Sequence, residues 1–356
     1  MTGRDVDGEG VTGRDVDGEG VMGRREIDAG EEHADAEAPP TTHDVDEIAI
    51  VGAGLMGHGI AIAYALSGHP VRLYDVDGGA LVAAGDRIDS VLETFREHGS
   101  VDRQAVAAAH ERITVGESFE TAVASADLVT EAVVEDLDVK RRVFVDLDTH
   151  APDDAILATN TSGFSITELA DEVDDPGRVV GTHWFTPPYV VPLVEVVRGE
   201  ETTDATVDRT YALLAAVGKT PVVVERDVPG FIGNRIQLAM AYEAFSLLEA
   251  EVASAADIDR AVKAGFGFRL PVLGIFEKAD HSGLAVHNAI ESYLLPELDR
   301  GTDPSSIVER LVEEGHDGLS SGREVYDWSE LDSADVYEQR DRALLDLLSV
   351  YESLEE

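Results

Sequence analysis

Hydrophobic and polar residues follow one pattern in the first two thirds of the chain and another pattern after it. From about residue 47 to residue 226, short β-branched runs are separated by amphipathic stretches with helical spacing. This alternation is typical of βαβ units around a parallel sheet. The predicted strands are Glu47–Val51, Val71–Asp75, Asp127–Val133, Ala155–Asn160, Val179–Phe185, Leu193–Val197 and Pro221–Glu225, and the helices between them include Met56–Ser67, Asp138–His150 and Ala205–Val217.

After Arg226 the strand pattern ends. Pro229 suits the first turn of a helix, and Ile232–Val252 continues with apolar residues at helical spacing. The pattern predicts an α/β fold with an N-terminal Rossmann-type dinucleotide-binding domain over residues 44–227. A smaller all-helical C-terminal domain over 228–330 and a charged C-terminal helix over 331–356 would follow. Because the long apolar helix has more surface than so small a domain can bury, we expect a two-fold homodimer.

The first 43 residues differ from both domains. A decapeptide at Thr2–Val11 is repeated at Thr12–Val21, and an acidic stretch containing alanine and proline follows. Segments of low hydrophobicity and high charge cannot bury enough apolar surface to offset the entropy of ordering. We therefore expect a disordered acidic extension and assign it no function.

The composition narrows the possible partners and the chemistry. With 72 acidic and 27 basic residues, the net charge of -45 would repel nucleic acids and anionic membranes. No window reaches the roughly 18 apolar residues of a membrane span, so we expect a cytoplasmic protein. The absence of cysteine excludes a disulfide framework and a thiolate nucleophile, and we predict no metal site. Acidic residues are spread along a chain that also has enough apolar residues to form a core, and this combination indicates a protein from a cell with a salt-rich cytoplasm.

A glycine-rich fingerprint lies between the first predicted strand and helix. Its residues are Gly52, Ala53, Gly54, Leu55, Met56 and Gly57, and Asp75 ends the next strand. In a GxGxxG turn the glycines permit a tight turn, close approach of the pyrophosphate and close packing of helix on strand. An acid such as Asp75 binds ribose hydroxyls, which favours NAD over NADP. Arg72 should lie on the opposite strand face, and His58 is expected to face solvent without a role.

A second group of polar residues is typical of alcohol oxidation. Ser162 follows a predicted strand, His183 lies near the end of another, and Glu195 lies within the apolar run Val191–Val197. Oxidation of an alcohol requires a base for the hydroxyl proton, and imidazole suits this role near neutral pH. A carboxylate on its far nitrogen would stabilise the imidazolium, and Glu195 needs a partner because an unpaired acid there is costly. From the residues alone, a structural histidine and a strand-edge acid remain alternatives.

The chain resembles the 3-hydroxyacyl-CoA dehydrogenase family from Asp46 to Trp328. The similar pieces, in order, are GAGLMGHGIA at Gly52, TEAVVEDLDVKRRVF at Thr130, NTSGFSI at Asn160, GTHWFTPP at Gly181, PLVEVV at Pro192, VPGFIGNR at Val228 and SGREVYDW at Ser321. The resemblance implies NAD-dependent oxidation of a short 3-hydroxyacyl-CoA and a homodimer. It places the dyad on His183 and Glu195, the polar residues of the substrate side on Ser162 and Asn234, and further cofactor contacts on Glu135, Lys140, Ser162 and Thr186.

Some residues depart from the family pattern. Thr186 stands where the family usually has asparagine, and its side chain is shorter. The stretches Gly265–Gly274 and Gln339–Leu345 are more similar to relatives that act on free hydroxy acids, the gulonate dehydrogenase or lambda-crystallin branch. The piece at Ser321 is more similar to the CoA branch. A free 3-hydroxy acid of the gulonate or carnitine type is therefore an alternative substrate.

Two other classes of protein, a hydrolase and a non-catalytic NAD-binding protein, fit the sequence less well than a dehydrogenase. A hydrolase would need a nucleophile elbow or a metal motif, and the sequence contains neither GxSxG nor HExxH. A non-catalytic NAD-binding protein would keep the glycine turn but would not need His183, Glu195, Ser162 and Asn234 together. This combination favours an enzyme.

Overall fold

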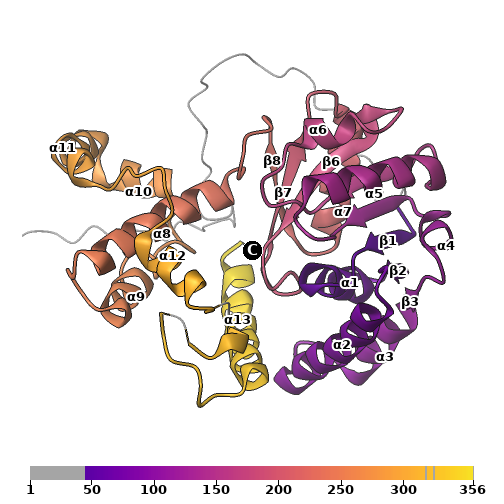
Figure 1. The fold of residues 1–356 in the computed structure, drawn as a ribbon, viewed down its shortest axis with the longest axis horizontal. Coiled ribbons are helices and arrows are strands. Elements are labelled where there is room, and N and C mark those ends of the chain that lie inside the picture. Colours follow the sequence, from indigo (N-terminus) through magenta and orange to yellow (C-terminus); the bar gives the residue numbers. More distant parts are fainter. Residues whose placement is uncertain (1–44, 317–318, 324, 356) are drawn as a thin grey trace, which may run out of the picture.

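A computed structural model describes residues 45–316, 319–323 and 325–355. The predicted disordered extension lies outside these residues. The first domain contains one eight-stranded sheet in the order β3-β2-β1-β4-β5-β6-β7-β8. Its strands are β1 (Ile48–Val51), β2 (Val71–Tyr74), β3 (Ile113–Val115), β4 (Leu128–Glu131), β5 (Ile156–Thr159), β6 (Val179–Trp184), β7 (Leu193–Arg198) and β8 (Thr220–Val224). Figure 1 shows this sheet with helices on both faces.

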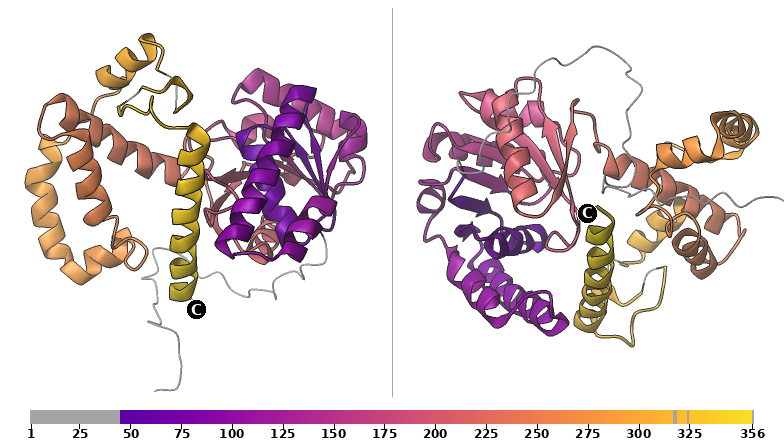
Figure 2. Two further views of the ribbon diagram at one scale, coloured as in Figure 1. Left: turned by 90° about the horizontal axis from the view of Figure 1, so that it is seen from below. Right: turned by 180° about the vertical axis from the view of Figure 1, so that it is seen from behind.

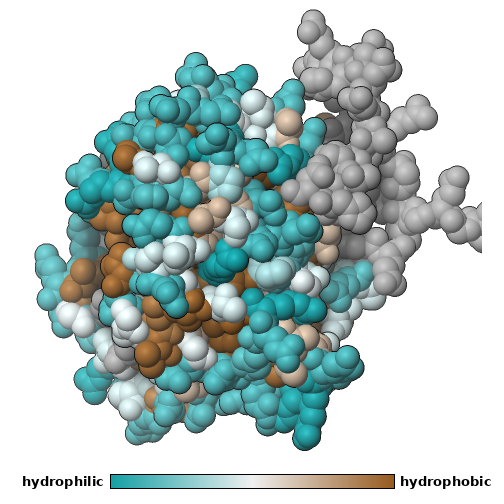
Figure 3. Space-filling view, turned by 90° about the vertical axis from the view of Figure 1, so that its right-hand side faces the viewer, coloured by the Kyte–Doolittle hydropathy of each residue, from teal (hydrophilic) through white to brown (hydrophobic). Residues whose placement is uncertain are grey.

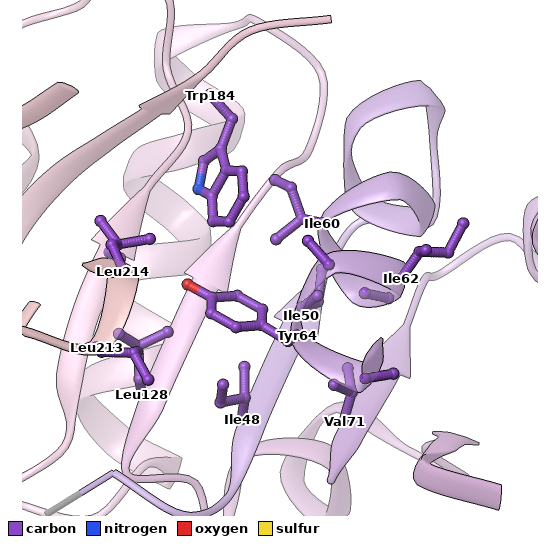
Figure 4. Packing of buried hydrophobic residues seen from close by; sticks show 14 of the residues in the cluster. Ile48, Ile50, Ile60, Ile62, Tyr64, Val71, Leu128, Trp184, Leu213 and Leu214 are labelled. Atoms are coloured by element: carbon purple, nitrogen blue, oxygen red, sulfur yellow. The ribbon is translucent and has the colours of Figure 1, made fainter. Parts of the chain in front are cut away.

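Two apolar layers cover the two faces of the sheet. One layer joins the sheet to α1 (Leu55–Ser67), α2 (Gly78–His98), α3 (Arg103–Arg112) and α7 (Asp204–Ala216). Within it, the buried rings of Tyr64 and Trp184 meet edge to face with centroids 5.5 Å apart, as Figure 4 shows. The other layer joins the sheet to α4 (Phe119–Val123), α5 (Leu137–His150) and α6 (Ile166–Ala170). The predicted Rossmann-type fold is confirmed.

The strand pairing positions the site. The order reverses between β1 and β4, and the crevice at the carboxyl ends of such strands is where open α/β sheets bind ligands. The expectation of a parallel sheet is wrong for one pair, because β6 and β7 run antiparallel. Only residues 185–192 connect them, which is too short for a parallel crossover. The strand β3 was not predicted, since it has only three residues and lies at an edge.

The second domain is helical, as predicted. It contains α8 (Gly233–Glu249), α9 (Ala255–Ala264), α10 (Ile275–Ser282), α11 (Leu284–Leu294) and α12 (Ser306–Glu313). Short 3-10 turns occur in this domain at Leu295–Glu297 and Leu319–Ser321, and another lies in the first domain at Pro176–Arg178. The last helix, α13 (Ser333–Glu355), returns to the first domain and packs against α2. Figure 2 shows it between the two domains. Within the described ranges, no helix is both long and apolar enough to span a bilayer.

Candidate active site

Three glycines shape the turn between β1 and α1. Gly52 has a φ of 107°, and a Cβ there would lie 2.4 Å from the carbonyl oxygen of Ala132. A Cβ on Gly57 would lie 1.8 Å from the carbonyl oxygen of Gly52, so both positions require glycine. Around Gly54 the space is open, and α1 begins there without a side-chain cap. The residues present therefore fit a pyrophosphate, which would meet the unpaired amides of the helix.

Asp75 stands at the end of β2 beside this turn. One carboxylate oxygen accepts a hydrogen bond of 2.7 Å from the amide of Ala53, and the other accepts one of 2.9 Å from the amide of Asp77. Arg72 instead pairs with Glu47 at 3.0 Å. The carboxylate thus helps to hold the fingerprint turn, and each oxygen keeps a lone pair with which it could accept a ribose hydroxyl.

The expectation that His58 faces solvent is wrong. The side chain is buried on α1, and its Nδ1 lies 2.8 Å from the carbonyl oxygen of Gly54. Burial lowers the pKa of His58, which favours the neutral ring. The reason is the helix itself, since residues 57 to 65 are buried continuously between the sheet and its neighbours.

A buried ionic network lies at the carboxyl ends of β4 and β5. Lys140 is only 1% exposed, and its Nζ lies 2.8 Å from Glu131 Oε1 and 3.1 Å from Glu135 Oε2. Glu131 is fully buried and also accepts hydrogen bonds from the hydroxyl of Thr159 and the amide of Val133. Lys140 therefore neutralises a buried acid that the sequence reasoning did not identify, and its role as a cofactor contact stays a prediction.

Glu135 links this network to the predicted substrate side. Its Oε1 accepts hydrogen bonds from the hydroxyl of Thr161 at 2.6 Å and from the amide of Ser162 at 2.7 Å. The hydroxyl of Ser162 is exposed and has no recorded partner among the described residues. The loop that presents this hydroxyl is thus fixed through its backbone.

His183 and Glu195 face each other across the antiparallel pair β6 and β7. They are direct register partners, and His183 Nδ1 lies 2.6 Å from Glu195 Oε2. Both are buried, with 4% and 1% of their surfaces exposed. Because a carboxylate accepts, Nδ1 carries the proton and Nε2 keeps its lone pair. The geometry gives the imidazole the orientation of a general base.

The other oxygen of Glu195 is held by the second domain. Oε1 accepts hydrogen bonds of 2.8 Å from the amides of Ile232 and Gly233, at the start of α8. Burial acts to raise the pKa of Glu195, but the hydrogen bonds from His183, Gly233 and Ile232 outweigh it and lower the pKa. The carboxylate is therefore ionised at neutral pH.

Two aromatic rings and Asn234 complete the surroundings of His183. The rings of Phe185 and Phe231 lie 4.5 and 5.5 Å from the imidazole, centroid to centroid. The Nδ2 of Asn234 lies 3.4 Å from His183 Nε2 and donates to the carbonyl oxygen of Ser162 at 3.0 Å. The structure thus brings together His183, Glu195, Asn234 and the Ser162 loop. The hydroxyl of Thr186 instead contacts the fingerprint turn, where it lies 3.2 Å from the sulfur of Met56.

Sequence reasoning missed Glu131 and Asn160. Glu131 ends an apolar strand, so the argument that a buried acid needs a partner applied to it as well as to Glu195. The side-chain oxygen of Asn160 accepts a hydrogen bond of 2.9 Å from the amide of Trp184, which ties the end of β5 to β6. No sequence signal distinguishes this structural role from a catalytic one. In the parts of the chain with described side chains, no group of three or more acids and histidines is placed to hold a metal ion.

The fold, the fingerprint turn and the histidine beside a carboxylate define a two-domain NAD-dependent dehydrogenase. Two family models match the chain: the NAD binding domain of 3-hydroxyacyl-CoA dehydrogenase over residues 47–228 and its C-terminal domain over residues 230–328. The chain belongs to the 3-hydroxyacyl-CoA dehydrogenase family.

Three relatives show the range of this family. The 5-formyl-3-hydroxy-2-methylpyridine 4-carboxylate 5-dehydrogenase of Mesorhizobium japonicum is 33% identical over 87% of this chain and 100% of its own length. The L-carnitine dehydrogenase of Streptomyces griseus is 33% identical over 87% of this chain and 91% of its own. A probable 3-hydroxybutyryl-CoA dehydrogenase of Bacillus subtilis is 36% identical over 81% of this chain and 99% of its own length. A solved structure of the pyridine carboxylate dehydrogenase has a TM-score of 0.80 and 31% identity, over 86% of this chain and 99% of that one.

Proposed function

We propose that the protein oxidises a short-chain 3-hydroxyacyl-CoA, of the 3-hydroxybutyryl-CoA type, to the 3-oxoacyl-CoA, with His183 as the general base. The observation that carries this proposal is the buried contact of 2.6 Å between His183 Nδ1 and Glu195 Oε2. It leaves Nε2 as the basic nitrogen, beside Asn234. A base in this position takes the hydroxyl proton while the alcohol becomes a carbonyl.

Each neighbouring residue has a part in this reaction. The fingerprint turn and Asp75 would hold NAD, which would supply the acceptor for the hydride of the carbinol carbon. Glu195 stabilises the imidazolium that forms on His183, as the carboxylate does in a hydrolase triad. The Ser162 hydroxyl and the Asn234 amide would bind the substrate oxygen. Glu135, Lys140 and Thr186 belong to the cofactor side, with Lys140 acting through Glu135.

A substrate panel tests this proposal. Purified protein in concentrated KCl is mixed either with NADH and acetoacetyl-CoA or with NAD and gulonate or carnitine. In each case the absorbance of NADH is followed. We expect consumption of NADH with acetoacetyl-CoA. The same panel with NADP and NADPH should give lower rates, because the Asp75 carboxylate would repel a 2′-phosphate. Inactivity with every substrate would show that the proposed function is wrong.

A free 3-hydroxy acid is the second candidate, and the match with relatives favours it. The L-carnitine dehydrogenase matches 87% of this chain, whereas the 3-hydroxybutyryl-CoA relative matches 81%. The family models end at residue 328, before α13. Oxidation of carnitine or gulonate without reduction of acetoacetyl-CoA would assign the protein to this branch.

The proposed enzyme is a homodimer in a salt-rich cytoplasm. Large apolar side chains of the second domain are exposed, among them Leu238 at 68%, Phe268 at 79% and Phe276 at 86%. Apolar surface of this extent marks an interface in a protein that is otherwise strongly charged. A second copy of the chain, related by a two-fold axis, would cover it.

A further inference from the structure

The loop of residues 185–192 connects the strand of His183 to the strand of Glu195. It folds back on itself, since the amides of Val190 and Val191 donate to the carbonyl oxygen of Pro187 at 3.1 and 2.9 Å. It also packs against α1, where a Cβ on Gly59 would lie 2.6 Å from Pro188 Cγ. The path of this loop therefore helps to set how the two catalytic strands meet.

Lys219 holds this loop from the start of β8. Its Nζ donates to the carbonyl oxygen of Pro188 at 2.7 Å and to that of Val191 at 3.0 Å. The same Nζ lies 5.4 Å from the ring centre of Trp184, the neighbour of His183 in the chain. None of the recorded ion pairs among the described residues involves Lys219, so backbone carbonyls and an aromatic face stabilise its charge. Burial lowers the pKa of Lys219 to about 8.

Asp341 of α13 holds the same loop from another direction. The hydroxyl of Tyr189 donates to Asp341 Oδ2 at 2.6 Å, and Asp341 is only 5% exposed. Val190 packs with Phe95 of α2 and Leu345 of α13 in a small apolar cluster. Figure 2 shows α13 as a separate helix beside the first domain. The helix is outside both family models, so nothing in the matched domains accounts for this contact.

We propose that Lys219 and Asp341 are positioning residues that fix the 185–192 loop and, through it, the contact between His183 and Glu195. The inference rests on the proposed role of His183 as the base. Neither residue reaches the imidazole, whose recorded contacts are with Glu195, Asn234 and the two phenylalanine rings. Their loss should lower kcat by more than it weakens the binding of NADH, because the loop contributes Thr186 to the cofactor side, whereas the fingerprint glycines and Asp75 lie on other elements.

The experiment uses single substitutions in the full chain. Lys219→Met removes the donors, and Tyr189→Phe removes the bond to Asp341 while keeping the ring. Lys263→Met and Glu352→Gln are matched controls, because the first removes an exposed lysine on α9 and the second an exposed acid on α13. The chain has two tryptophans, Trp184 and Trp328. All variants therefore carry Trp328→Phe, which leaves Trp184 as the one source of tryptophan emission. The parent with this substitution is the reference.

Misplacement of a catalytic group by about 1 Å can cost roughly 100-fold in rate, and a loosened loop should cost less. We expect kcat to fall roughly tenfold in Lys219→Met and in Tyr189→Phe. The NADH dissociation constant should stay within about twofold, and the Trp184 emission should change. Asp341→Asn, which keeps an acceptor for the Tyr189 hydroxyl, should retain most of the parent's activity.

Three outcomes would overturn the proposal. The proposal is wrong if kcat in Lys219→Met and in Tyr189→Phe equals that of the controls. It is also wrong if NADH binding weakens by the same factor as kcat falls, because that would show a general structural role. If Lys219→Met does not fold, Tyr189→Phe decides, since it removes one hydroxyl only. If the parent is inactive with every substrate, the proposed function is wrong, and an unchanged Trp184 emission in both variants would then separately refute the role of the loop.

Discussion

The two domains differ sharply in how much of their apolar surface they bury. The first domain has continuous apolar layers on both sides of its sheet, with most strand residues fully buried. Among the described residues of the second domain, from 233 to 328, Ala279 is the one apolar side chain that is buried. Its helices α9 and α12 each contact α8, but most apolar side chains of these three helices are exposed or only half-buried. The first domain therefore buries its apolar surface within the chain, whereas the exposed apolar side chains of the second fit the proposed contact with a second copy.

The largest effect should come from removing salt, which tests this difference directly. At a net charge of -45, carboxylates repel one another in the folded state, and the outer face of the first domain in Figure 3 is largely hydrophilic. The screening length is about 3 Å at 1 M salt and about 10 Å at 0.1 M. We expect loss of activity and structure below about 0.1 M KCl, with the second domain unfolding first. Far-UV circular dichroism, turnover and hydrogen exchange across a KCl series measure this. An unchanged spectrum and rate over hours at low salt would show that the acidic excess has no such role.

The second prediction separates catalysis from the stability of the first domain. His183→Ala should lower kcat by roughly 10²–10⁴-fold, because the base is lost. NADH affinity should be nearly unchanged, since the fingerprint turn lies at β1 and α1. Steady-state kinetics and NADH fluorescence measure the two quantities. His110→Ala, which changes a half-exposed histidine of α3, is the control, and full turnover in the His183 variant would exclude this residue as the base.

The third prediction tests the exposed apolar surface of the second domain. Phe276→Glu places a charge at a side chain that is 86% exposed on α10, and it should weaken the homodimer roughly 100-fold. Light scattering in concentrated KCl measures the mass. Val145→Glu on α5 of the first domain, where the side chain is 46% exposed, should leave the mass unchanged. A parent protein that is already monomeric would contradict the comparison between the domains.

The smallest expected effect concerns Lys219 and pH. Its folded pKa is about 8, below the value of about 10.4 in an unfolded chain. Between these values the unfolded state binds more protons, so the folded state gains stability as pH rises. Relative to Lys219→Met, the parent should therefore gain free energy of unfolding, by less than about 3 kcal/mol, between pH 7 and pH 10. Urea denaturation at several pH values in constant KCl measures it, and parallel curves would show that the side chain does not titrate in this range.

Much of the fold follows from local sequence patterns. The predicted strands and their observed counterparts agree within two residues at most ends, because β-branched runs and helix-stopping glycines are local signals. The antiparallel β6 and β7 pair was not predicted, although the eight residues between the strands were visible in the sequence. Burial of His58 depends on how α1 packs against the sheet and the elements around it, many of which are far from α1 in the sequence. Such contacts have no signature in a single sequence.

In the dyad of His183 and Glu195, too, some features could be predicted from the sequence and others could not. Its two residues were identified from the chemistry of the reaction and the resemblance, and their roles stay a prediction. The amides that hold Glu195 Oε1 belong to Ile232 and Gly233, in a different domain. Gly233 must lack a side chain there, because a Cβ would lie 2.4 Å from the Phe185 ring. A pattern analysis of α8 could not reveal this contact, since backbone donors are the same at every position.

The bonds from Ile232 and Gly233 to Glu195 also make two main-chain amides reporters of the site. Both protons are sequestered only while α8 is seated against β7. Their exchange with deuterated solvent thus measures how often the junction between the domains opens. Each opening leaves a buried carboxylate with fewer donors, while its bond to His183 within the first domain is kept. The fraction of molecules in which Glu195 keeps both of these donors can therefore be measured at equilibrium from the two amides, without substrate or cofactor.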